Sequence, residues 1–230
     1  MKILILGAAG MIGRKLAHAL QTDNQLSSSS DSLILHDVVM PASVQGQMEC
    51  TTLSGNLSYP AQAEALAALR PDVIFHLASI VSGEAERDFD LGWQVNMKGG
   101  WQFIEALRHQ HDESKGAYRP KIIFASSIAI FGPPFPQAID DDFLAAPQTS
   151  YGAQKPLWNC SSLIMRAKAL LMGCPSACQP FVCAPASLML LPLAFFQALS
   201  ESRLTGLRRF YPCRHQCVIG MPHHVRLLGL

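Results

Sequence analysis

Hydrophobic residues in the first two thirds of the chain fall into short continuous runs. The runs cover residues 2–6, 33–37, 72–79 and 121–125, and they are rich in Ile, Leu, Val and Phe, as in strands that are buried on both faces. Segments with helical spacing lie between them, at residues 14–21, 61–69 and 88–108. This alternation predicts an α/β fold with a doubly wound parallel sheet, in which a ligand lies at the carboxyl ends of the strands. Residues 38–55 and 84–86 are expected to be loops.

Three glycines follow the first hydrophobic run, in the order Gly-Ala-Ala-Gly-Met-Ile-Gly. A strand, a glycine-rich turn and a helix are typical of the first unit of a Rossmann-type dinucleotide-binding fold. Gly7 would allow the sharp turn, Gly10 would let the backbone approach a pyrophosphate, and Gly13 would let the helix pack close to the sheet. The phosphates would lie at the positive end of that helix. A tight turn without a ligand is the alternative.

Asp37 ends the second hydrophobic run, 24 residues after Gly13. An acid at about this distance is expected to hydrogen-bond the ribose hydroxyls of an adenosine, and its charge would repel a 2′-phosphate. The sequence therefore favours NAD over NADP, and a solvated acid at a strand end is the alternative. Residues 55–58, which include Leu57, lie where a third strand would deliver a residue to the adenine.

The composition is that of a globular chain, but charges and cysteines are unevenly distributed. The 230 residues are 49% hydrophobic and 15% charged, with a net charge of +1, which gives no sign of a nucleic-acid partner. Residues 1–155 hold 11 Lys+Arg and 16 Asp+Glu, whereas residues 156–230 hold 7 Lys+Arg, the single acid Glu201 and six of the seven cysteines. We expect no membrane partner and a cytoplasmic location, because the apolar residues 187–199 are too few to span a bilayer.

Three polar residues suggest a catalytic group. Ser127 follows the run at residues 121–125. Tyr151 stands four residues before Lys155 at a predicted helix start, so Tyr151 and Lys155 share one helix face. A neighbouring ammonium and a bound nicotinamide cation would stabilise the tyrosine phenolate, which normally forms near pH 10. The phenolate would take a proton from a substrate hydroxyl while a hydride leaves for the nicotinamide, and Ser127 would hold the same oxygen. A strand-end capping serine and a surface helix pair are the alternatives.

Taken together, the motifs of residues 1–155 resemble the extended short-chain dehydrogenases/reductases, the NAD-dependent epimerase/dehydratase family. The resemblance rests on GAAGMIG, HLAS, FASSIAIFG and YGAQK, and the segment SIAIFG followed by PPFP is similar to the D-erythronate dehydrogenase subgroup. It implies catalysis by Ser127, Tyr151 and Lys155. It also implies an NAD site that comprises Gly7, Gly10, Met11, Ile12, Gly13, Asp37, Leu77, Ala78 and Asn96. To these residues we add Leu57, from its position after the expected third strand, and the pair of Tyr151 and Lys155.

The family pattern stops after Lys155. Pro156 follows where the family helix should continue, and residues 156–230 contain seven prolines. A shift of the reading frame between Lys155 and Trp158 would explain this tail, because codons permitted by its residues encode, in the overlapping frame, an amphipathic helix, a strand and an Arg-Pro-Gly turn. We therefore expect an NAD-binding region at 1–155 and a substrate-binding part that is missing or non-native. A zinc site among the tail cysteines, such as Cys174 and Cys178, is the competing hypothesis, but their spacing matches no known pattern and we predict no metal.

These observations leave two classes of function. The first is an NAD-dependent oxidoreductase that oxidises a hydroxyl of a small sugar acid such as D-erythronate, with a nucleotide-sugar epimerase or dehydratase as the alternative enzyme. The second is an NAD-binding remnant without catalysis. The resemblance also implies a homodimer through the helix at residues 88–108 and the helix after Tyr151, although Pro156 is expected to break the second. Without its substrate part, the chain is expected to bind NAD weakly and to turn over little substrate.

Overall fold

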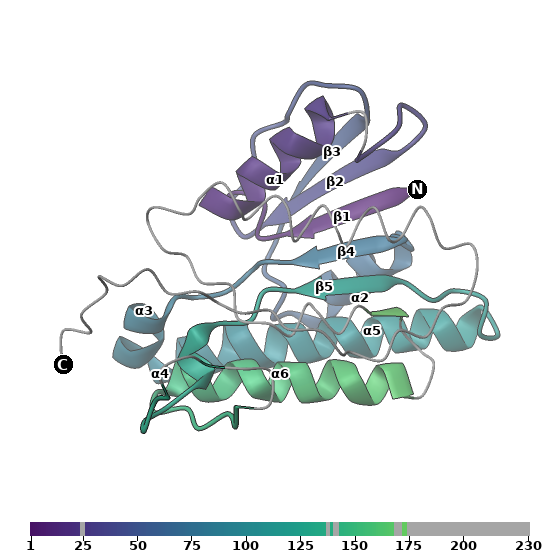
Figure 1. The fold of residues 1–230 in the computed structure, drawn as a ribbon. Coiled ribbons are helices and arrows are strands. Elements are labelled where there is room, and N and C mark those ends of the chain that lie inside the picture. Colours follow the sequence, from purple (N-terminus) through teal and green to yellow (C-terminus); the bar gives the residue numbers. More distant parts are fainter. Residues whose placement is uncertain (24–25, 137–138, 140–142, 168–171, 174–230) are drawn as a thin grey trace.

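The computed structural model describes residues 1–23, 26–136, 139, 143–167 and 172–173, and in them six parallel strands form one sheet (Figure 1). The strands are β1 Lys2–Leu6, β2 Ser32–Asp37, β3 Glu49–Ser54, β4 Val73–His76, β5 Lys121–Phe124 and β6 Met172–Gly173. The α-helices are α1 Met11–Thr22, α2 Pro60–Ala68, α3 Ser82–Arg87, α4 Phe89–Trp93, α5 Gly100–Glu113 and α6 Ser150–Ala167. A π-helical segment η1, Gln94–Gly99, joins α4 to α5, and a 3₁₀ turn η2, Ile128–Ile130, follows β5.

The strand order β3-β2-β1-β4-β5-β6 confirms the predicted doubly wound sheet. β1 lies between β2 and β4, so that Ile3 is level with Leu33 on one side and with Val73 on the other. The chain first moves outward to β2 and β3, and then crosses back to β4 and β5 on the opposite side of β1. The connections therefore diverge at the carboxyl ends of β1 and β4, which is where ligands bind in sheets of this kind.

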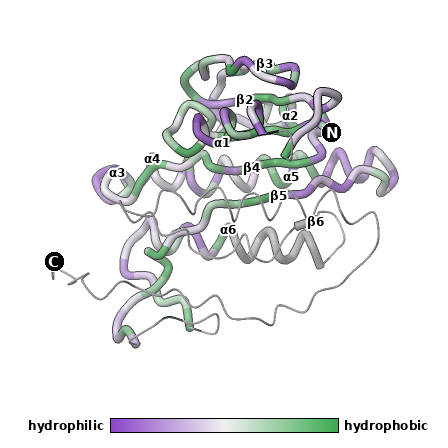
Figure 2. The backbone as a smooth tube through the Cα atoms, turned by 45° about the horizontal axis from the view of Figure 1, so that its top comes forward, coloured by the Kyte–Doolittle hydropathy of each residue, from purple (hydrophilic) through white to green (hydrophobic). Residues whose placement is uncertain are grey.

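The two faces of the sheet are covered by different helices. Ile3 and Ile5 of β1 pack with residues of α1, whereas Leu4 and Leu6 pack with residues of α2, α5 and α6, including Trp158. Burial on both faces explains why the strands are continuous hydrophobic runs rather than alternating patterns. In Figure 2 the central strands are coloured hydrophobic, and the connection from α5 to β5 is coloured hydrophilic.

Two expected loops are regular elements instead. Strand β3 lies inside residues 38–55 and pairs with β2 along its whole length, from Ser32–Glu49 to Asp37–Ser54. It is an outer strand whose residues are exposed or half-buried, so it lacks the hydrophobic run that marks a central strand. Residues 84–86 lie in helix α3, which is only six residues long, too short for a clear hydrophobic period.

The long helix expected at residues 88–108 is present in three pieces. α4 ends at Trp93, η1 follows without a break, and α5 continues to Glu113. A π-helical turn widens the helix locally, and such turns are frequent at functional sites. Here the turn carries Asn96 into the interior, with 6% of its surface exposed.

Pro156 does not break its helix, contrary to the sequence-based expectation. α6 runs through it from Ser150 to Ala167. A proline in a helix interior removes one backbone hydrogen bond and costs about 3 kcal/mol. The cost is offset because the residues around it are anchored: Lys155 is 4% and Trp158 is 2% exposed, and the indole of Trp158 stacks on Phe124 at 4.1 Å. The proposed limit at residue 155 therefore falls inside a helix, and the division into 1–155 and 156–230 stays a prediction.

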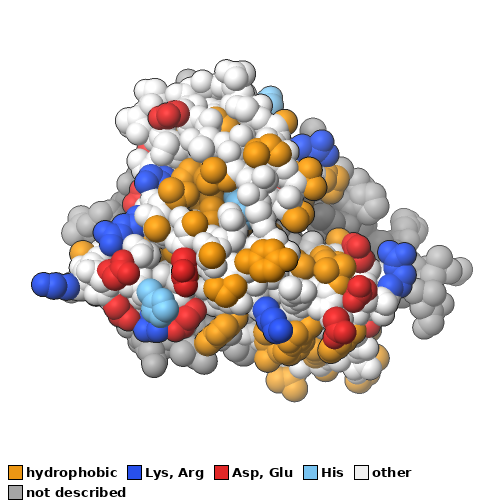
Figure 3. Space-filling view, turned by 180° about the vertical axis from the view of Figure 1, so that it is seen from behind, with side chains coloured by type: hydrophobic (Ala, Val, Ile, Leu, Met, Phe, Trp, Pro, Cys, Tyr) orange, Lys and Arg blue, Asp and Glu red, His pale blue; other side chains and the backbone are white. Residues whose placement is uncertain are grey.

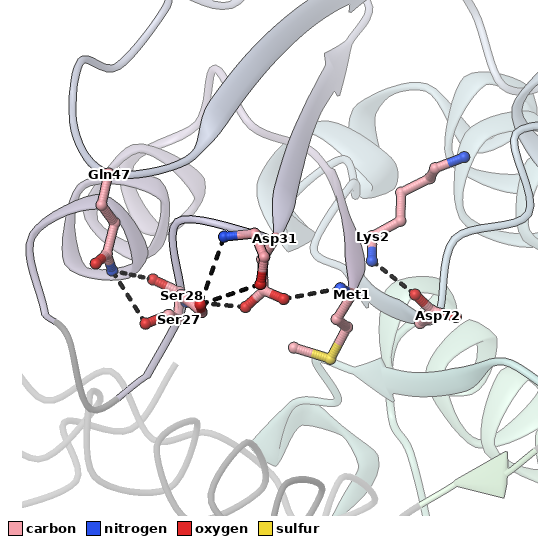
Figure 4. Close-up of polar contacts among 8 residues, drawn as sticks. Met1, Lys2, Ser27, Ser28, Asp31, Gln47 and Asp72 are labelled. Atoms are coloured by element: carbon pink, nitrogen blue, oxygen red, sulfur yellow. Dashed lines mark hydrogen bonds and ion pairs between the residues drawn. The ribbon is translucent and has the colours of Figure 1, made fainter.

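Polar contacts fix the amino end of the sheet, opposite the carboxyl ends of the strands (Figure 4). The amino group of Met1 forms an ion pair with Asp31 at 2.7 Å, and the backbone N–H of Lys2 donates to Asp72 at 2.6 Å. Asp31 is 7% exposed and also accepts from the backbone N–H of Ser28. These bonds hold β1 to the residues that lead into its neighbours β2 and β4.

The tail cysteines of the competing zinc hypothesis, including Cys174 and Cys178, lie outside the described residues, and the prediction of a missing or non-native substrate-binding part also falls outside them. Among the helices that are described, none combines the length and apolar character needed to cross a bilayer.

Candidate functional site

The glycine turn packs so closely that two of its positions admit no side chain. Gly7 has a φ of 87°, and a Cβ there would lie 2.6 Å from the backbone N of Ala78. A Cβ on Gly13 would lie 2.2 Å from the carbonyl oxygen of Gly7. Gly13 thus lets α1 pack closely on the turn, and the positive φ of Gly7 forms the sharp turn, as predicted for these two glycines. The close approach of Gly7 to the end of β4 was not predicted.

Gly10 differs from the other two because its surroundings are open. A Cβ there would meet, among the described residues, only the carbonyl oxygen of Gly7, at 3.3 Å. Gly10 is the N-cap of α1, no side chain caps the helix, and its first turn contains no acid. Met11 and Ile12 supply the next backbone N–H groups, while the side chain of Ile12 packs on the core. This open, uncapped helix end fits a pyrophosphate.

Asp37 is held beside the turn by backbone donors. One carboxylate oxygen accepts from the N–H of Ala9 at 2.9 Å and the other from the N–H of Val38 at 2.7 Å. A carboxylate offers about four acceptor positions, so two further hydrogen bonds can be made to ribose hydroxyls. Leu57 lies in the loop after β3 at the same edge of the sheet, with its side chain partly buried against the core.

The segment after β4 passes the glycine turn. β4 ends at His76, three residues earlier than the predicted strand, and the N–H of Leu77 still donates to Leu6 at 2.8 Å. Ala78 then contacts Gly7, which places both predicted residues beside the turn. Asn96 does not reach this surface with its amide: its Oδ1 accepts from the N–H of Ile80 at 2.9 Å, and the whole side chain is buried.

Tyr151 and Lys155 share one face of α6, as their spacing predicted. The ammonium of Lys155 lies 5.2 Å from the centre of the Tyr151 ring and donates to the carbonyl of Ala125, just after β5, at 3.2 Å. Ser127 follows two residues later and accepts from the N–H of Ala129 at 3.2 Å, so its own hydroxyl hydrogen is available to a ligand. The turn η2 also packs on α6, because a Cβ at Gly152 would meet the carbonyl of Ala129 at 2.2 Å.

Burial governs the electrostatics around Lys155. Desolvation lowers the pKa of Lys155 to about 8, and the ammonium also lies 4.8 Å from the centre of the Phe124 ring. His76 is buried beside Trp158, with ring centres 4.9 Å apart. Desolvation and, secondly, the charge of Lys155 lower the pKa of His76 to about 3, so the ring is neutral at pH 7. His76 is therefore a neutral histidine of the core.

Two contacts of α6 were missed by sequence reasoning. Gln154 is 2% exposed and accepts from the amide of Asn96 at 2.8 Å, which joins α6 to η1. Glu86 of α3 accepts from the hydroxyl of Ser150 at 2.6 Å and from the N–H of Tyr151 at 3.0 Å. Glu86 is 65 residues away from Tyr151 in the chain, and no spacing rule connects two positions so distant.

The comparisons with known proteins agree with this geometry. Residues 3–163 match the NAD dependent epimerase/dehydratase family. The chain belongs to that family. The matched segment includes the glycine turn, Asp37, Ser127, Tyr151 and Lys155, and it extends eight residues beyond the limit of 155 that the sequence suggested.

Two curated relatives carry the same name. The chain is 38% identical over 164 residues to D-erythronate dehydrogenase of Haemophilus influenzae, covering 71% of this chain and 49% of the relative. It is 35% identical over 162 residues to D-erythronate dehydrogenase of Cupriavidus necator, covering 68% of this chain and 48% of that protein. The chain thus spans about half the length of the curated relatives it matches.

Solved structures give the same fold. The nucleoside-diphosphate-sugar epimerase of Agrobacterium tumefaciens is 37% identical with a TM-score of 0.68, covering 82% of this chain and 56% of that structure. UDP-glucose 4-epimerase of Thermus thermophilus, solved in complex with NAD, has a TM-score of 0.58 at 22% identity, covering 75% of this chain and 53% of that structure. The second similarity supports the Rossmann-type sheet alone.

Within the described part of the chain, no group of three or more His, Cys, Asp or Glu side chains is placed to hold a metal ion.

Proposed function

We propose that this chain binds NAD at the carboxyl ends of β1, β2 and β4 and has the catalytic residues of an oxidoreductase that acts on a small sugar acid. The observation that carries the proposal is the placement of Lys155 against both the Tyr151 ring and the end of β5, in a fold whose first turn is open for a pyrophosphate. The names of the two D-erythronate dehydrogenases support D-erythronate as the first substrate to test.

In this proposal, NAD would accept a hydride from the carbon that bears the substrate hydroxyl. Tyr151 takes the hydroxyl proton on its phenolate oxygen, and the nearby ammonium of Lys155 stabilises that phenolate. Ser127 donates its hydroxyl hydrogen to the same substrate oxygen, because its Oγ is already oriented by the N–H of Ala129. Asp37 accepts from the adenosine ribose, and its charge disfavours a 2′-phosphate.

A nucleotide-sugar epimerase or dehydratase is the second candidate, supported by the family name and by the 37% identical Agrobacterium tumefaciens structure. The same three catalytic residues serve both reactions, so the substrate decides between them. A binding protein without turnover is the third candidate, because the motifs that resemble the family stop after Lys155 and the sequence of residues 156–230 lacks the expected late strand.

The test combines binding and turnover. NADH is titrated into the chain by fluorescence. D-erythronate is then tested for the formation of NADH from NAD, and a nucleotide sugar is tested for conversion to its epimer or its dehydrated product. Tyr151→Phe is expected to bind NADH like the unchanged chain and to lose turnover, since it removes only the phenolic oxygen. A chain that binds no NADH would contradict the proposal, and equal turnover of the Tyr151→Phe variant would contradict the assigned base.

We further propose that the tail is out of frame. The expected interval for the frame shift runs from Lys155 to Trp158. The indole of Trp158 is 2% exposed and stacks on Phe124, as expected of a residue that still belongs to the fold, so we place the shift at the Trp158 end of the interval. Sequencing the coding DNA across codons 150 to 165 tests this. A missing or extra base there would restore the frame that encodes the substrate-binding half of the protein. A DNA sequence that confirms Pro156-Leu157-Trp158 would contradict the frame shift and favour a chain that binds NAD weakly and turns over little substrate.

A homodimer through α4, η1 and α5 is proposed as the assembly. Three large apolar side chains are exposed there: Phe89 (57%), Trp93 (39%) and Trp101 (50%). Figure 3 shows hydrophobic side chains across the middle of the rear face, between charged side chains at both ends. Trp101→Glu is expected to convert the dimer to a monomer in analytical ultracentrifugation, and a monomeric unchanged chain would contradict the proposal.

A further inference from the structure

The first turn of α6 is held by two different acceptors. Thr149, the residue before the helix, accepts from the N–H of Gly152 at 3.0 Å through its hydroxyl, as an ordinary N-cap does. The N–H of Tyr151 belongs to the same set of helix-starting donors that have no acceptor within the helix. It donates instead to Glu86, which comes from α3. The peptide of the proposed catalytic base is thus fixed from outside its own helix.

Glu86 contacts the start of α6 through a single oxygen with two donors. Its Oε1 accepts from the hydroxyl of Ser150 at 2.6 Å and from the N–H of Tyr151 at 3.0 Å. These bonds lower the pKa of Glu86 below the usual carboxyl range, with the Ser150 hydroxyl as the larger cause. The carboxylate is therefore ionised at neutral pH and lies at the positive end of the α6 dipole.

Helix α3 is itself firmly placed. Ala85, the residue before Glu86, has no exposed surface and packs on Gly92 of α4, where a Cβ would lie 2.9 Å from that of Ala85. α3 begins at Ser82, four residues after Ala78, and the segment of Leu77 and Ala78 contacts the glycine turn. Glu86 therefore joins the segment beside the proposed cofactor site to the backbone of Tyr151.

We propose that Glu86 is a positioning residue for Tyr151: it fixes the first turn of α6, and with it the place of the phenol relative to Lys155 and Ser127. The inference rests on the proposed function for the catalytic role of Tyr151. The contact itself is independent of that role, which lets the two be tested separately.

Three variants of the full 230-residue chain isolate the contact. Glu86→Ala removes the acceptor. Glu86→Gln keeps an Oε1 that can accept from Ser150 and Tyr151 but removes the charge. Glu84→Ala is the matched control, because Glu84 is an exposed acid on the same helix, two residues away, and makes neither contact. Since Glu86 is on the surface, all three variants are expected to fold.

The measurements are amide hydrogen exchange at Tyr151, the dissociation constant for NADH, and kcat and KM for the sugar acid at saturating NAD. Glu86→Ala should raise the exchange rate at Tyr151 at least tenfold and lower kcat at least tenfold, with the NADH dissociation constant and KM changed less than threefold. Glu86→Gln should restore most of both, and Glu84→Ala should match the unchanged chain. A structural cap alone would move the exchange rate and leave kcat unchanged.

The outcomes separate the two proposals. If Glu86→Ala exchanges at Tyr151 no faster than Glu84→Ala, or if it exchanges faster with an unaltered kcat, the positioning role is wrong while NAD binding can stand. If the unchanged chain binds no NADH, or binds it without turnover of the sugar acid, the proposed oxidoreductase function is wrong, and so is the catalytic role of the contact. Faster exchange at Tyr151 in Glu86→Ala would then show only that the contact holds the first turn of α6.

Discussion

Replacing Lys155 by methionine should stabilise the folded chain at neutral pH. The ammonium is 4% exposed, and the described structure gives it one hydrogen bond, to the carbonyl of Ala125, and the faces of two aromatic rings. Methionine has a similar length and no charge. Lys155→Met thus removes a buried charge without opening a large cavity, and it removes the group that would stabilise the Tyr151 phenolate.

The magnitude follows from the pKa of Lys155, which burial lowers from 10.5 to about 8. One pKa unit corresponds to about 1.4 kcal/mol, so the charged lysine destabilises the fold at pH 7 by about 3 kcal/mol. Between these two pKa values the unfolded chain binds more protons than the folded chain, so the free energy of unfolding rises with pH there. The advantage of methionine should therefore shrink to about 1 kcal/mol at pH 10.

Urea unfolding followed by tryptophan fluorescence at pH 7 and pH 10 measures both differences. The control is Lys98→Met on η1, where the lysine is exposed and the variant should differ little from the unchanged chain at either pH. NADH titration of the same variants should show weakened binding only for Lys155→Met. The reasoning is refuted if Lys155→Met is less stable than the unchanged chain at pH 7, or if its advantage is the same at both pH values.

Three further substitutions have expected outcomes. Gly13→Ala forces a Cβ to within 2.2 Å of the Gly7 oxygen, so thermal unfolding should show a loss of about 1–3 kcal/mol, with weaker NADH binding. Trp158→Ala should cost about 3–5 kcal/mol in urea unfolding, because it opens a cavity in the core, and a loss below 1 kcal/mol would contradict the packing of α6. Asp31→Asn removes the ion pair with Met1 and should cost about 1–3 kcal/mol at pH 7, measured by the same unfolding assay.

The pH dependence of Glu86 has a definite sign. Its pKa is lowered by the hydroxyl of Ser150 and the N–H of Tyr151. The contribution of the ionised carboxylate to the stability of the fold is therefore fully present above the usual carboxyl pKa, and it is lost as the pH falls through the lower pKa of the folded chain. Exchange at the Tyr151 amide should therefore become slightly faster at acid pH in the unchanged chain, relative to its intrinsic rate, up to the level of Glu86→Gln, because a protonated carboxyl still accepts through its carbonyl oxygen. Glu86→Gln and Glu86→Ala should show no such additional change.

The sequence by itself was enough for the centre of the sheet. β1, β2, β4 and β5 were predicted within a few residues, because a strand buried on both faces needs an uninterrupted hydrophobic run. The glycine turn was equally visible, since φ at Gly7 and the contact at Gly13 each exclude a side chain. Strand β3 was missed because an outer strand with exposed positions carries no such run.

The shared helix face of Tyr151 and Lys155 was also predicted, because helix spacing is a local feature, and Ser127 was placed by the end of its strand. That the three act together in catalysis stays a prediction. Only the tertiary structure decided what lies around them. The burial that lowers the pKa of Lys155, the neutral His76 and the continuation of α6 through Pro156 all depend on packing between distant elements. Glu86 is the clearest case. The packing of Ala85 on α4 places Glu86 beside the N–H of Tyr151, and no local sequence pattern predicts a contact between residues that are 65 positions apart.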